Sequence, residues 1–239
     1  MPTITTEHNT ASNIEKNISF FSENEEYQKN VNSMDTYNYM RLSIENELDG
    51  VKSLLDIGNG GFFNYDITNV PRVVALDLFL DEKKNYGRNV TAIQGDALNF
   101  TIPYGVKIEK FDAIIVQMLI HHLPGASPEQ AVRNIDLLFE HCRKHLSEKG
   151  KLIIIESTVP SWFYGFEKTA FRVLNPIWSF PHPLVIQHTP EELLAAAKRN
   201  DLSIKEYTWI PKGKWVLQFG LPFPAALTPI QPIKLVLTK

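Results

Sequence analysis

The segment that decides the fold reads Val51-Lys-Ser-Leu-Leu-Asp-Ile-Gly-Asn-Gly-Gly61, and Val73-Val-Ala-Leu-Asp77 follows it. In each segment an apolar run leads to a carboxylate, and the first carboxylate opens a glycine-rich turn. This order is typical of a nucleotide-type cofactor site at the carboxyl edge of a parallel sheet. Glycines let the backbone approach a ligand closely, and the second carboxylate is placed to accept hydrogen bonds from both hydroxyls of a ribose. The two segments therefore predict an α/β fold with a cofactor at the ends of its first two strands.

The composition indicates a globular protein without an obvious nucleic-acid partner. The chain has 239 residues, 44% of them hydrophobic, and a formal net charge of −3. Because phosphate binding needs a basic face, this charge gives no reason to expect nucleic acid. The single cysteine, Cys142, excludes an internal disulfide, which fits a reducing cytoplasm. The N-terminus lacks the features of a signal peptide and no apolar run is long enough to span a bilayer, so we expect a cytoplasmic protein.

Strand and helix patterns alternate along most of the chain. Residues 1–18 are polar and are expected to be flexible, and residues 20–50 are expected to form a helical cap in which Asp35 is a helix N-cap. The predicted strands are 53–57, 72–76, 90–94, 111–118, 151–156, 203–210 and 233–237, and two further helices are predicted at 127–146 and 190–200. Residues 157–188 are rich in aromatic residues without a clean period, and we interpret them as a substrate-side insertion. We expect one domain over residues 19–239.

These motifs, in this order, resemble those of the class I S-adenosylmethionine-dependent methyltransferases over residues 35–239. The resemblance implies a Rossmann-like, doubly wound sheet of seven strands, mostly parallel with one antiparallel strand near the C-terminus. It also implies S-adenosylmethionine as the cofactor and S-adenosylhomocysteine as the product. The residues that it assigns to the cofactor are Asp56, Gly58, Asn59, Gly60, Asp77, Leu78, Gly95, Asp96, Ala97, Gln117 and Met118.

The resemblance also implies a role for each part of this set. Asp56 would organise the glycine loop, whose backbone would lie against the amino-acid end of the cofactor. Asp77 would hold the ribose, and Asp96 would receive the adenine amino group. Gln117 and Met118 would lie beside the sulfonium centre.

Two departures from the family pattern fall just after the glycine loop. Phe62 stands where a third small residue is usual, and residues 62–71 have poor helix propensity. We therefore expect this loop to have a local shape of its own. A nicotinamide nucleotide is the alternative cofactor, but its fingerprint needs a glycine where Phe63 stands.

Two histidines after the fourth predicted strand, His121 and His122, are the candidates for a catalytic base. Methyl transfer from a sulfonium is an in-line displacement, so the protein must mainly align the acceptor, and a base helps when the acceptor is a hydroxyl. The two histidines either take that proton or hold their loop through hydrogen bonds. Glu156, which ends the next strand, either binds the acceptor or organises the same loop. No metal is expected, because the helical pair His141 and His145 has no third ligand nearby.

The aromatic segment supplies the other candidates for substrate binding, which are Trp162, Tyr164 and His182. Aromatic side chains there suit a flat or apolar acceptor, although core packing is the more ordinary role for any single one of them. His182 and His188 either point into the substrate pocket or are satisfied loop histidines. We predict a cytoplasmic methyltransferase that acts on a small-molecule acceptor in specialised biosynthesis. Two alternatives stay open: a cyclisation or rearrangement with the cofactor in a non-methylating role, and a non-catalytic subunit that binds a partner through its apolar tail near Leu221. A homodimer is compatible with the sequence.

Overall fold

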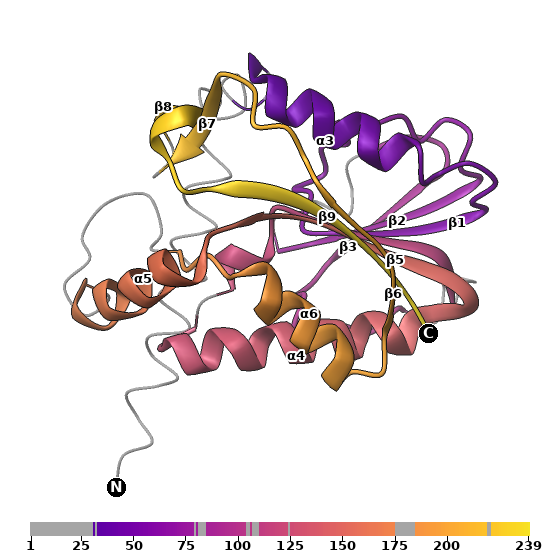
Figure 1. Ribbon diagram of the computed structural model, residues 1–239. Helices are drawn as coiled ribbons and strands as arrows, with labels where there is room; N and C mark the ends of the chain where they lie inside the picture. Colours follow the sequence, from indigo (N-terminus) through magenta and orange to yellow (C-terminus); the bar gives the residue numbers. More distant parts are fainter. Residues whose placement is uncertain are drawn as a thin grey trace, which may run out of the picture.

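The computed structural model describes residues 31, 33–78, 80, 85–103, 106, 110–123, 125–174, 185–218 and 221–239. The segment 1–18 and the first part of the expected helical cap lie outside these residues. The described elements form a seven-stranded sheet with helices on both faces and a separate two-stranded hairpin (Figure 1). The assignment of residues 19–239 to one domain stays a prediction.

The sheet has the strand order β3-β2-β1-β4-β5-β9-β6. Its strands are β1 (Ser53–Ile57), β2 (Arg72–Asp77), β3 (Val90–Gln94), β4 (Phe111–Gln117), β5 (Leu146–Thr158), β6 (Ser203–Trp209) and β9 (Gln231–Thr238). Neighbouring strands from β3 to β5 pair in parallel, whereas β9 pairs antiparallel with both β5 and β6. The prediction of a mostly parallel, doubly wound sheet with one antiparallel strand near the C-terminus is therefore confirmed.

Helices cover both faces of this sheet (Figure 1). The helices are α3 (Asp35–Glu45), α4 (Pro128–His145), α5 (Ser161–Leu174) and α6 (Pro190–Arg199), and η1 (Ile120–His122) and η3 (Ala225–Leu227) are short 3-10 helices. α3 lies on one face, and α4 and α6 lie on the other. Alternate side chains of β5 enter two cores, since Ile153 and Ile155 pack on the α3 side and Leu152 and Ile154 on the α4 side. A strand that is buried on both faces reads as a nearly continuous apolar run.

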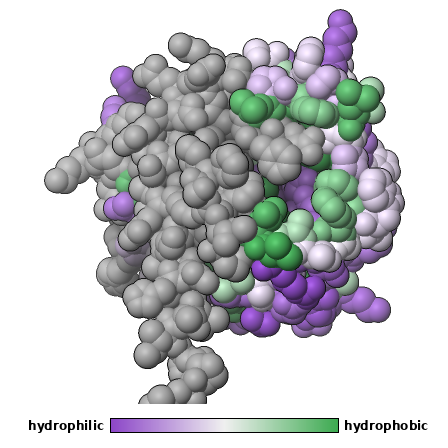
Figure 2. Space-filling model, turned by 90° about the vertical axis from the view of Figure 1, so that its left-hand side faces the viewer, coloured by the Kyte–Doolittle hydropathy of each residue, from purple (hydrophilic) through white to green (hydrophobic). Residues whose placement is uncertain are grey.

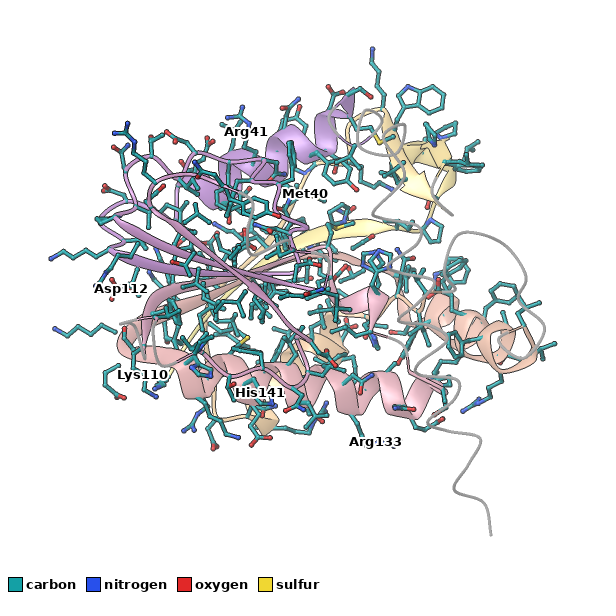
Figure 3. All side chains as sticks on the ribbon, turned by 180° about the vertical axis from the view of Figure 1, so that it is seen from behind. Met40, Arg41, Lys110, Asp112, Arg133 and His141 are labelled. Atoms are coloured by element: carbon teal, nitrogen blue, oxygen red, sulfur yellow. The ribbon has the colours of Figure 1, made fainter. Side chains whose placement is uncertain are left out.

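Side chains on α3 and at the amino edge of the sheet show how the scaffold is held. Met40 is 1% exposed and turns toward the sheet, whereas Arg41 points outward (Figure 3). At the start of β4, the Asp112 carboxylate accepts hydrogen bonds from the backbone N–H groups of Lys52 and Ser53, both at 3.1 Å. These contacts join β4 to β1 at their amino ends and leave the opposite, carboxyl edge to carry a site.

The starts of α4 and α6 agree with the sequence, and the start of α3 does not. The Ser127 hydroxyl accepts a hydrogen bond from the Gln130 N–H at 3.2 Å, and the Thr189 hydroxyl accepts one from the Glu192 N–H at 3.1 Å. Both are N-caps, followed by a proline in the first helical turn. The prediction of Asp35 as an N-cap is wrong, because Asp35 is already the first residue of α3.

The helix α5 and the hairpin of β7 (Trp215–Gln218) and β8 (Leu221–Pro224) are absent from the sequence-based prediction. Both carry exposed apolar side chains, among them Trp162 at 72% and Leu221 at 67%. From the side that carries these elements, the visible described residues show apolar patches separated by polar ones (Figure 2). No helix in the described part of the chain is long and apolar enough to cross a membrane.

Candidate functional site

The carboxyl ends of the parallel strands gather the predicted site residues at one edge of the sheet. The strand order reverses at β1, which has β2 on one side and β4 on the other. Ligands of open α/β sheets bind at this kind of switch point. The glycine loop follows β1, Asp77 ends β2, and η1 follows β4.

Two carboxylates hold the glycine loop. The Asn59 side-chain amide donates to Asp56 Oδ2 at 2.8 Å, and Asn59 Oδ1 accepts from the Gly61 N–H at 2.7 Å. The Gly60 N–H donates to Asp77 Oδ2, also at 2.8 Å. The loop is therefore bonded to the end of its own strand and to the end of β2.

Asp56 is a buried carboxyl group that is bonded to the hydroxyl of Tyr65. It is 1% exposed, and the Tyr65 hydroxyl donates a hydrogen bond to its Oδ2. Its second oxygen, Oδ1, is buried and has no hydrogen-bond partner among the described residues. Burial raises the pKa of Asp56 to about 7, hydrogen bonds from Tyr65 and Asn59 act against this rise, and the charge of Asp77 adds to it.

The segment that brings Tyr65 to this place is not helical. No residue from 62 to 71 is in a helix, as the sequence predicts, and Phe62 is 48% exposed. A dinucleotide places its pyrophosphate on a helix N-terminus directly after the glycine loop. The missing helix therefore argues against the nicotinamide alternative, whereas S-adenosylmethionine has no phosphate to bind.

The glycines of the loop differ in what surrounds them. Gly58, Gly60 and Gly61 all have positive φ angles, of 84°, 61° and 78°. A Cβ atom on Gly58 would lie 2.7 Å from the Leu119 side chain, and one on Gly61 would lie 2.4 Å from the Tyr86 ring. No described atom lies within 4 Å of the corresponding position on Gly60. The open backbone of Gly60 thus fits close approach by the amino-acid end of a cofactor.

The end of β3 is bonded to the end of β2. The Gly95 N–H donates to the Asp77 carbonyl at 3.0 Å, and the Gln94 side-chain amide donates to the Leu78 carbonyl at 3.0 Å. Hydrogen bonds therefore hold Leu78 and Gly95 next to Asp77, the predicted ribose ligand.

The predicted adenine segment forms a tight turn. Asp96 Oδ1 accepts from the Leu98 N–H at 2.9 Å, and the Asn99 N–H donates to the Asp96 carbonyl at 3.0 Å. Ala97 is 8% exposed and joins the core on the α4 side. The turn holds Asp96 at the carboxyl edge, two strands from the glycine loop.

The chain leaves β4 through a strained residue. Met118 has a φ of 52°, in the left-handed region that side chains other than glycine rarely adopt, and its N–H donates to the Ile155 carbonyl at 2.8 Å. Gln117 is the last residue of β4 and is half-buried. Strain of this kind often persists at functional sites, and here it turns the chain sharply into η1.

His121 and Glu156 form a buried pair next to this turn. Their Nδ1 and Oε1 atoms are 2.6 Å apart, and Glu156 is 1% exposed. Glu156 also accepts the N–H groups of Ser157 and Ile120, each at 2.7 Å. The His122 ring lies 4.1 Å from that of His121. Glu156 thus organises the loop, as one of its two predicted roles requires, and it also orients the imidazole of His121.

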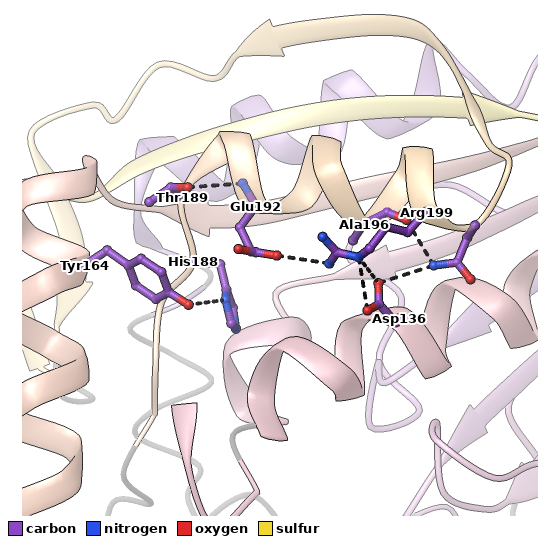
Figure 4. A network of polar contacts seen from close by, with 8 residues as sticks. Asp136, Tyr164, His188, Thr189, Glu192, Ala196 and Arg199 are labelled. Carbon is purple, nitrogen blue, oxygen red and sulfur yellow. Dashed lines mark hydrogen bonds and ion pairs between the residues drawn. The ribbon is translucent and has the colours of Figure 1, made fainter. Parts of the chain in front are cut away.

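A third histidine, His188, lies against the same pair. It is 1% exposed, and its Nδ1 is 3.5 Å from the Tyr164 hydroxyl (Figure 4). Burial lowers the pKa of His188 to about 4; the charge of Glu156 acts against this and that of His121 adds to it. Of the two interpretations of His188, that of a satisfied loop histidine does not hold, because its Nε2 is buried without a hydrogen-bond partner among the described residues.

Backbone contacts fix His188 in place. The Val159 N–H donates to the His188 carbonyl at 3.1 Å, and the Ile186 N–H donates to the His121 carbonyl at 3.4 Å. The Gln187 side-chain amide donates to the Ser157 hydroxyl at 3.0 Å. The segment 186–188 therefore closes over the ends of β4 and β5.

No family model matches this sequence, and no curated protein matches it. Solved structures do match. One is the 1,6-didemethyltoxoflavin-N1-methyltransferase of Burkholderia thailandensis, with bound 1,6-didemethyltoxoflavin and S-adenosylhomocysteine, at 13% identity and a TM-score of 0.64 over 100% of this chain and 92% of that one. A geranyl diphosphate methyltransferase in complex with S-adenosylmethionine matches at 11% identity and a TM-score of 0.55 over 84% of each chain. The N-methyltransferase NodS of Bradyrhizobium japonicum WM9, in complex with S-adenosylhomocysteine, matches at 13% identity and a TM-score of 0.55. This match covers 86% of this chain and 89% of that one.

The chain has the class I S-adenosylmethionine-dependent methyltransferase fold. At these identities the likeness concerns the fold, and the role of each site residue in this methyltransferase fold stays a prediction. Tyr65 and Leu119 contact the glycine loop and were not singled out from the sequence. A phenol nine residues after a strand carboxylate carries no pattern that could have identified it.

The residues predicted to bind the substrate do not all lie at this edge of the sheet. Tyr164 is buried beside His188, and burial raises its pKa to about 12, so it stays a protonated phenol. Trp162 lies on the outer side of α5 with 72% of its surface exposed, and His182 lies outside the described residues. Within the described part of the chain, no group of three or more His, Cys, Asp or Glu residues could hold a metal ion.

Proposed function

We propose that the protein is an S-adenosylmethionine-dependent methyltransferase that methylates a hydroxyl group of a small-molecule acceptor. The observation that carries this proposal is the contact between the two halves of the site. The Leu119 side chain lies so close to Gly58 that it would meet an added Cβ atom at 2.7 Å. Leu119 directly precedes η1, so the turn that carries His121 packs on the glycine loop. A methyl donor held by that loop would therefore lie next to His121 and Glu156.

The cofactor half consists of the glycine loop and the carboxylates that hold it. When bound, S-adenosylmethionine supplies a methyl group that is already activated on a sulfonium. Asp77 would bind the ribose hydroxyls while it keeps the Gly60 N–H on Oδ2. Gly60 would offer open backbone to the amino-acid end, and Asp96 would meet the adenine amino group.

The acceptor half supplies a base. Because Nδ1 of His121 faces Glu156, the ring nitrogen left to take a proton from an acceptor is Nε2. As the proton arrives, the imidazole becomes cationic and the Glu156 carboxylate stabilises that charge. A hydroxyl needs such a base, whereas a neutral amine already offers a lone pair, and this difference favours oxygen as the nucleophile.

Fold-level similarity supports a small molecule as the acceptor. The similar structures include enzymes whose names give 1,6-didemethyltoxoflavin and geranyl diphosphate as substrates. The net charge of −3 offers no general attraction for nucleic acid. A cytoplasmic location and a role in specialised biosynthesis stay predictions.

Binding of S-adenosylhomocysteine, measured by calorimetry, tests the cofactor half. We expect the Asp77→Ala variant to bind at least about tenfold more weakly than wild type, or about 1.4 kcal/mol, because it loses both the ribose contact and the bond to Gly60. Asp66→Ala is the matched control, because Asp66 is an exposed carboxylate bonded to Thr68 within its own turn. Wild-type protein that does not bind the ligand would contradict the proposal.

Transfer of labelled methyl groups to a panel of small phenols and enols tests the acceptor half. With any compound that is methylated, we expect His121→Gln to lower turnover by roughly 10²- to 10⁴-fold, the usual contribution of a general base, while its affinity for S-adenosylhomocysteine stays close to wild type. His141→Gln is the control, because His141 lies on α4 and packs on Phe100. Full turnover in His121→Gln would rule out His121 as the base.

A further inference from the structure

We propose that Tyr65 and Asp56 act together as a proton-linked latch on the glycine loop, so that the cofactor binds more tightly when Asp56 is ionised. This inference rests on the proposed function, because it concerns the same cofactor site. Tyr65 is a positioning residue in this scheme, since it acts through Asp56. It lies in the non-helical segment 62–71 that follows the glycine loop.

The latch lies in an apolar setting. Asp56 pairs in register with Ala75 of β2 and Ile115 of β4, so its strand neighbours offer no charge. On the same face of the sheet, α3 contributes buried Met40 and Tyr37 to the core that also contains Tyr65.

The ionised Asp56 carboxylate can fix the positions of Asn59 and Tyr65 directly and that of Gly61 through Asn59. Asp56 Oδ2 accepts the Asn59 amide and the Tyr65 hydroxyl, and Asn59 in turn accepts the Gly61 N–H. Hydrogen bonds to a charged acceptor are about twice as strong as neutral ones. Protonation of Asp56 removes that charge, weakens both bonds and frees Asn59, which sets the shape of the loop.

A buried acceptor is also left over. Asp56 Oδ1 is buried and has no partner among the described residues, which is costly for a charged oxygen. Burial raises the pKa of Asp56 to about 7, and the nearby charge of Asp77 contributes to the rise. The proton is therefore gained and lost near neutral pH. A cofactor that carries a positive ammonium group favours the ionised form of Asp56 by simple attraction.

The experiment is calorimetric binding of S-adenosylhomocysteine between pH 6 and pH 8.5. If only the ionised form binds, wild-type affinity should rise by up to about tenfold between pH 6 and pH 8. Asp56→Asn cannot titrate and should keep only the slope that comes from the ligand's own amino group. In Tyr65→Phe the midpoint should move to higher pH. The hydrogen bond from Tyr65 lowers the pKa of Asp56 in wild type, so its loss raises that pKa. Tyr39→Phe, a change on the exposed side of α3, should leave the wild-type profile unchanged.

Two results would overturn the latch: the same pH profile in wild type and Asp56→Asn, or a Tyr65→Phe midpoint equal to that of wild type. If Asp56→Asn does not fold, the Tyr65→Phe midpoint decides. Wild-type protein that binds no S-adenosylhomocysteine at any pH contradicts the proposed function instead. In that case the Asp56 carboxyl can be titrated directly by carbon NMR without ligand, where an unchanged midpoint in Tyr65→Phe would still refute the latch.

Discussion

Burial decides the protonation state of His188. Its ring is 1% exposed, close to the carboxylate of Glu156 and to a second histidine, and burial lowers its pKa from 6.5 to about 4. In the proposed reaction, a neutral His188 would add no second positive charge next to the one that His121 gains when it accepts a proton. Two cations side by side in this buried place would repel each other.

The low pKa of His188 should make the free energy of unfolding depend on pH. The unfolded chain protonates His188 near pH 6.5 and the folded chain only near pH 4. Stability due to the neutral ring is therefore fully present above pH 6.5 and is lost as the pH falls toward 4, by on the order of 3 kcal/mol. In urea unfolding, wild type should lose this amount relative to His188→Gln across that range.

Only the difference between the two proteins is informative. The pKa values of Asp56 and Glu167 are raised by burial to about 7 and about 8, so both groups reduce stability as the pH rises from acid to neutral. They are present in wild type and variant alike and cancel in the comparison. A difference that stays flat from pH 7 to pH 4 would show that His188 is protonated as easily in the folded state as in the unfolded state.

Single residues of the candidate site were predictable where a pattern marks them. Asp56 and Asp77 stand at strand ends beside a glycine turn, and the structure bonds both to that turn. The pairing of His121 with Glu156 was not predictable, because it depends on the register in which Gln117 of β4 faces Ile155 of β5. Register between strands is set by packing of the whole sheet.

At the scale of elements, the strands were the most predictable part. The ranges predicted for β1 and β3 agree with the structure, because both runs are too short for a helix and each is flanked by glycine. The helix α5 was missed because its sequence is rich in aromatic residues that obscure a helical period, although its buried side chains, Tyr164 and Phe171, lie seven positions apart. The hairpin of β7 and β8 was missed because Pro222 and Pro224 argue against a strand, and an edge strand tolerates them.

The segment 62–71 shows what an irregular element can do that a helix cannot. The poor helix propensity of this segment was predictable from its sequence, but the irregular conformation that it adopts was not. Asp66 N–H bonds to Glu45 on α3 at 3.1 Å, and Tyr65 reaches Asp56 beneath the glycine loop. The segment 62–71 thus connects the strand end below the glycine loop to α3 on that face of the sheet.

At the scale of the whole molecule, one ion cluster joins distant parts of the chain. Lys234 on β9 lies 3.1 Å from Glu47, just after α3, and 2.8 Å from Glu206 on β6. Lys151 on β5 lies 2.9 Å from Glu47. Burial alone would raise the pKa of Glu47, but hydrogen bonds from Lys151 and Lys234 outweigh it and lower the pKa.

Removing the central cation should therefore destabilise the fold. We expect Lys234→Met to reduce the free energy of unfolding by about 3 kcal/mol, because Glu47 and Glu206 lose a partner that is only 7% exposed. Urea unfolding measures this as a lower midpoint with an unchanged slope. Lys239→Met is the control, since its partner Glu148 is 90% exposed and the expected change is below about 1 kcal/mol. Equal losses in the two variants would contradict a structural role for the cluster.

The position of β9 has a consequence for biosynthesis. Of the seven strands in the sheet β9 is the last to be synthesised, yet it lies between β5 and β6. A nascent chain that has reached β6 on the ribosome still has an unpaired edge on the apolar strand β5, and β6 has no neighbour in the sheet. The sheet closes only when residues 231–238 have left the exit tunnel. Until then the growing chain depends on protection of that edge from other chains.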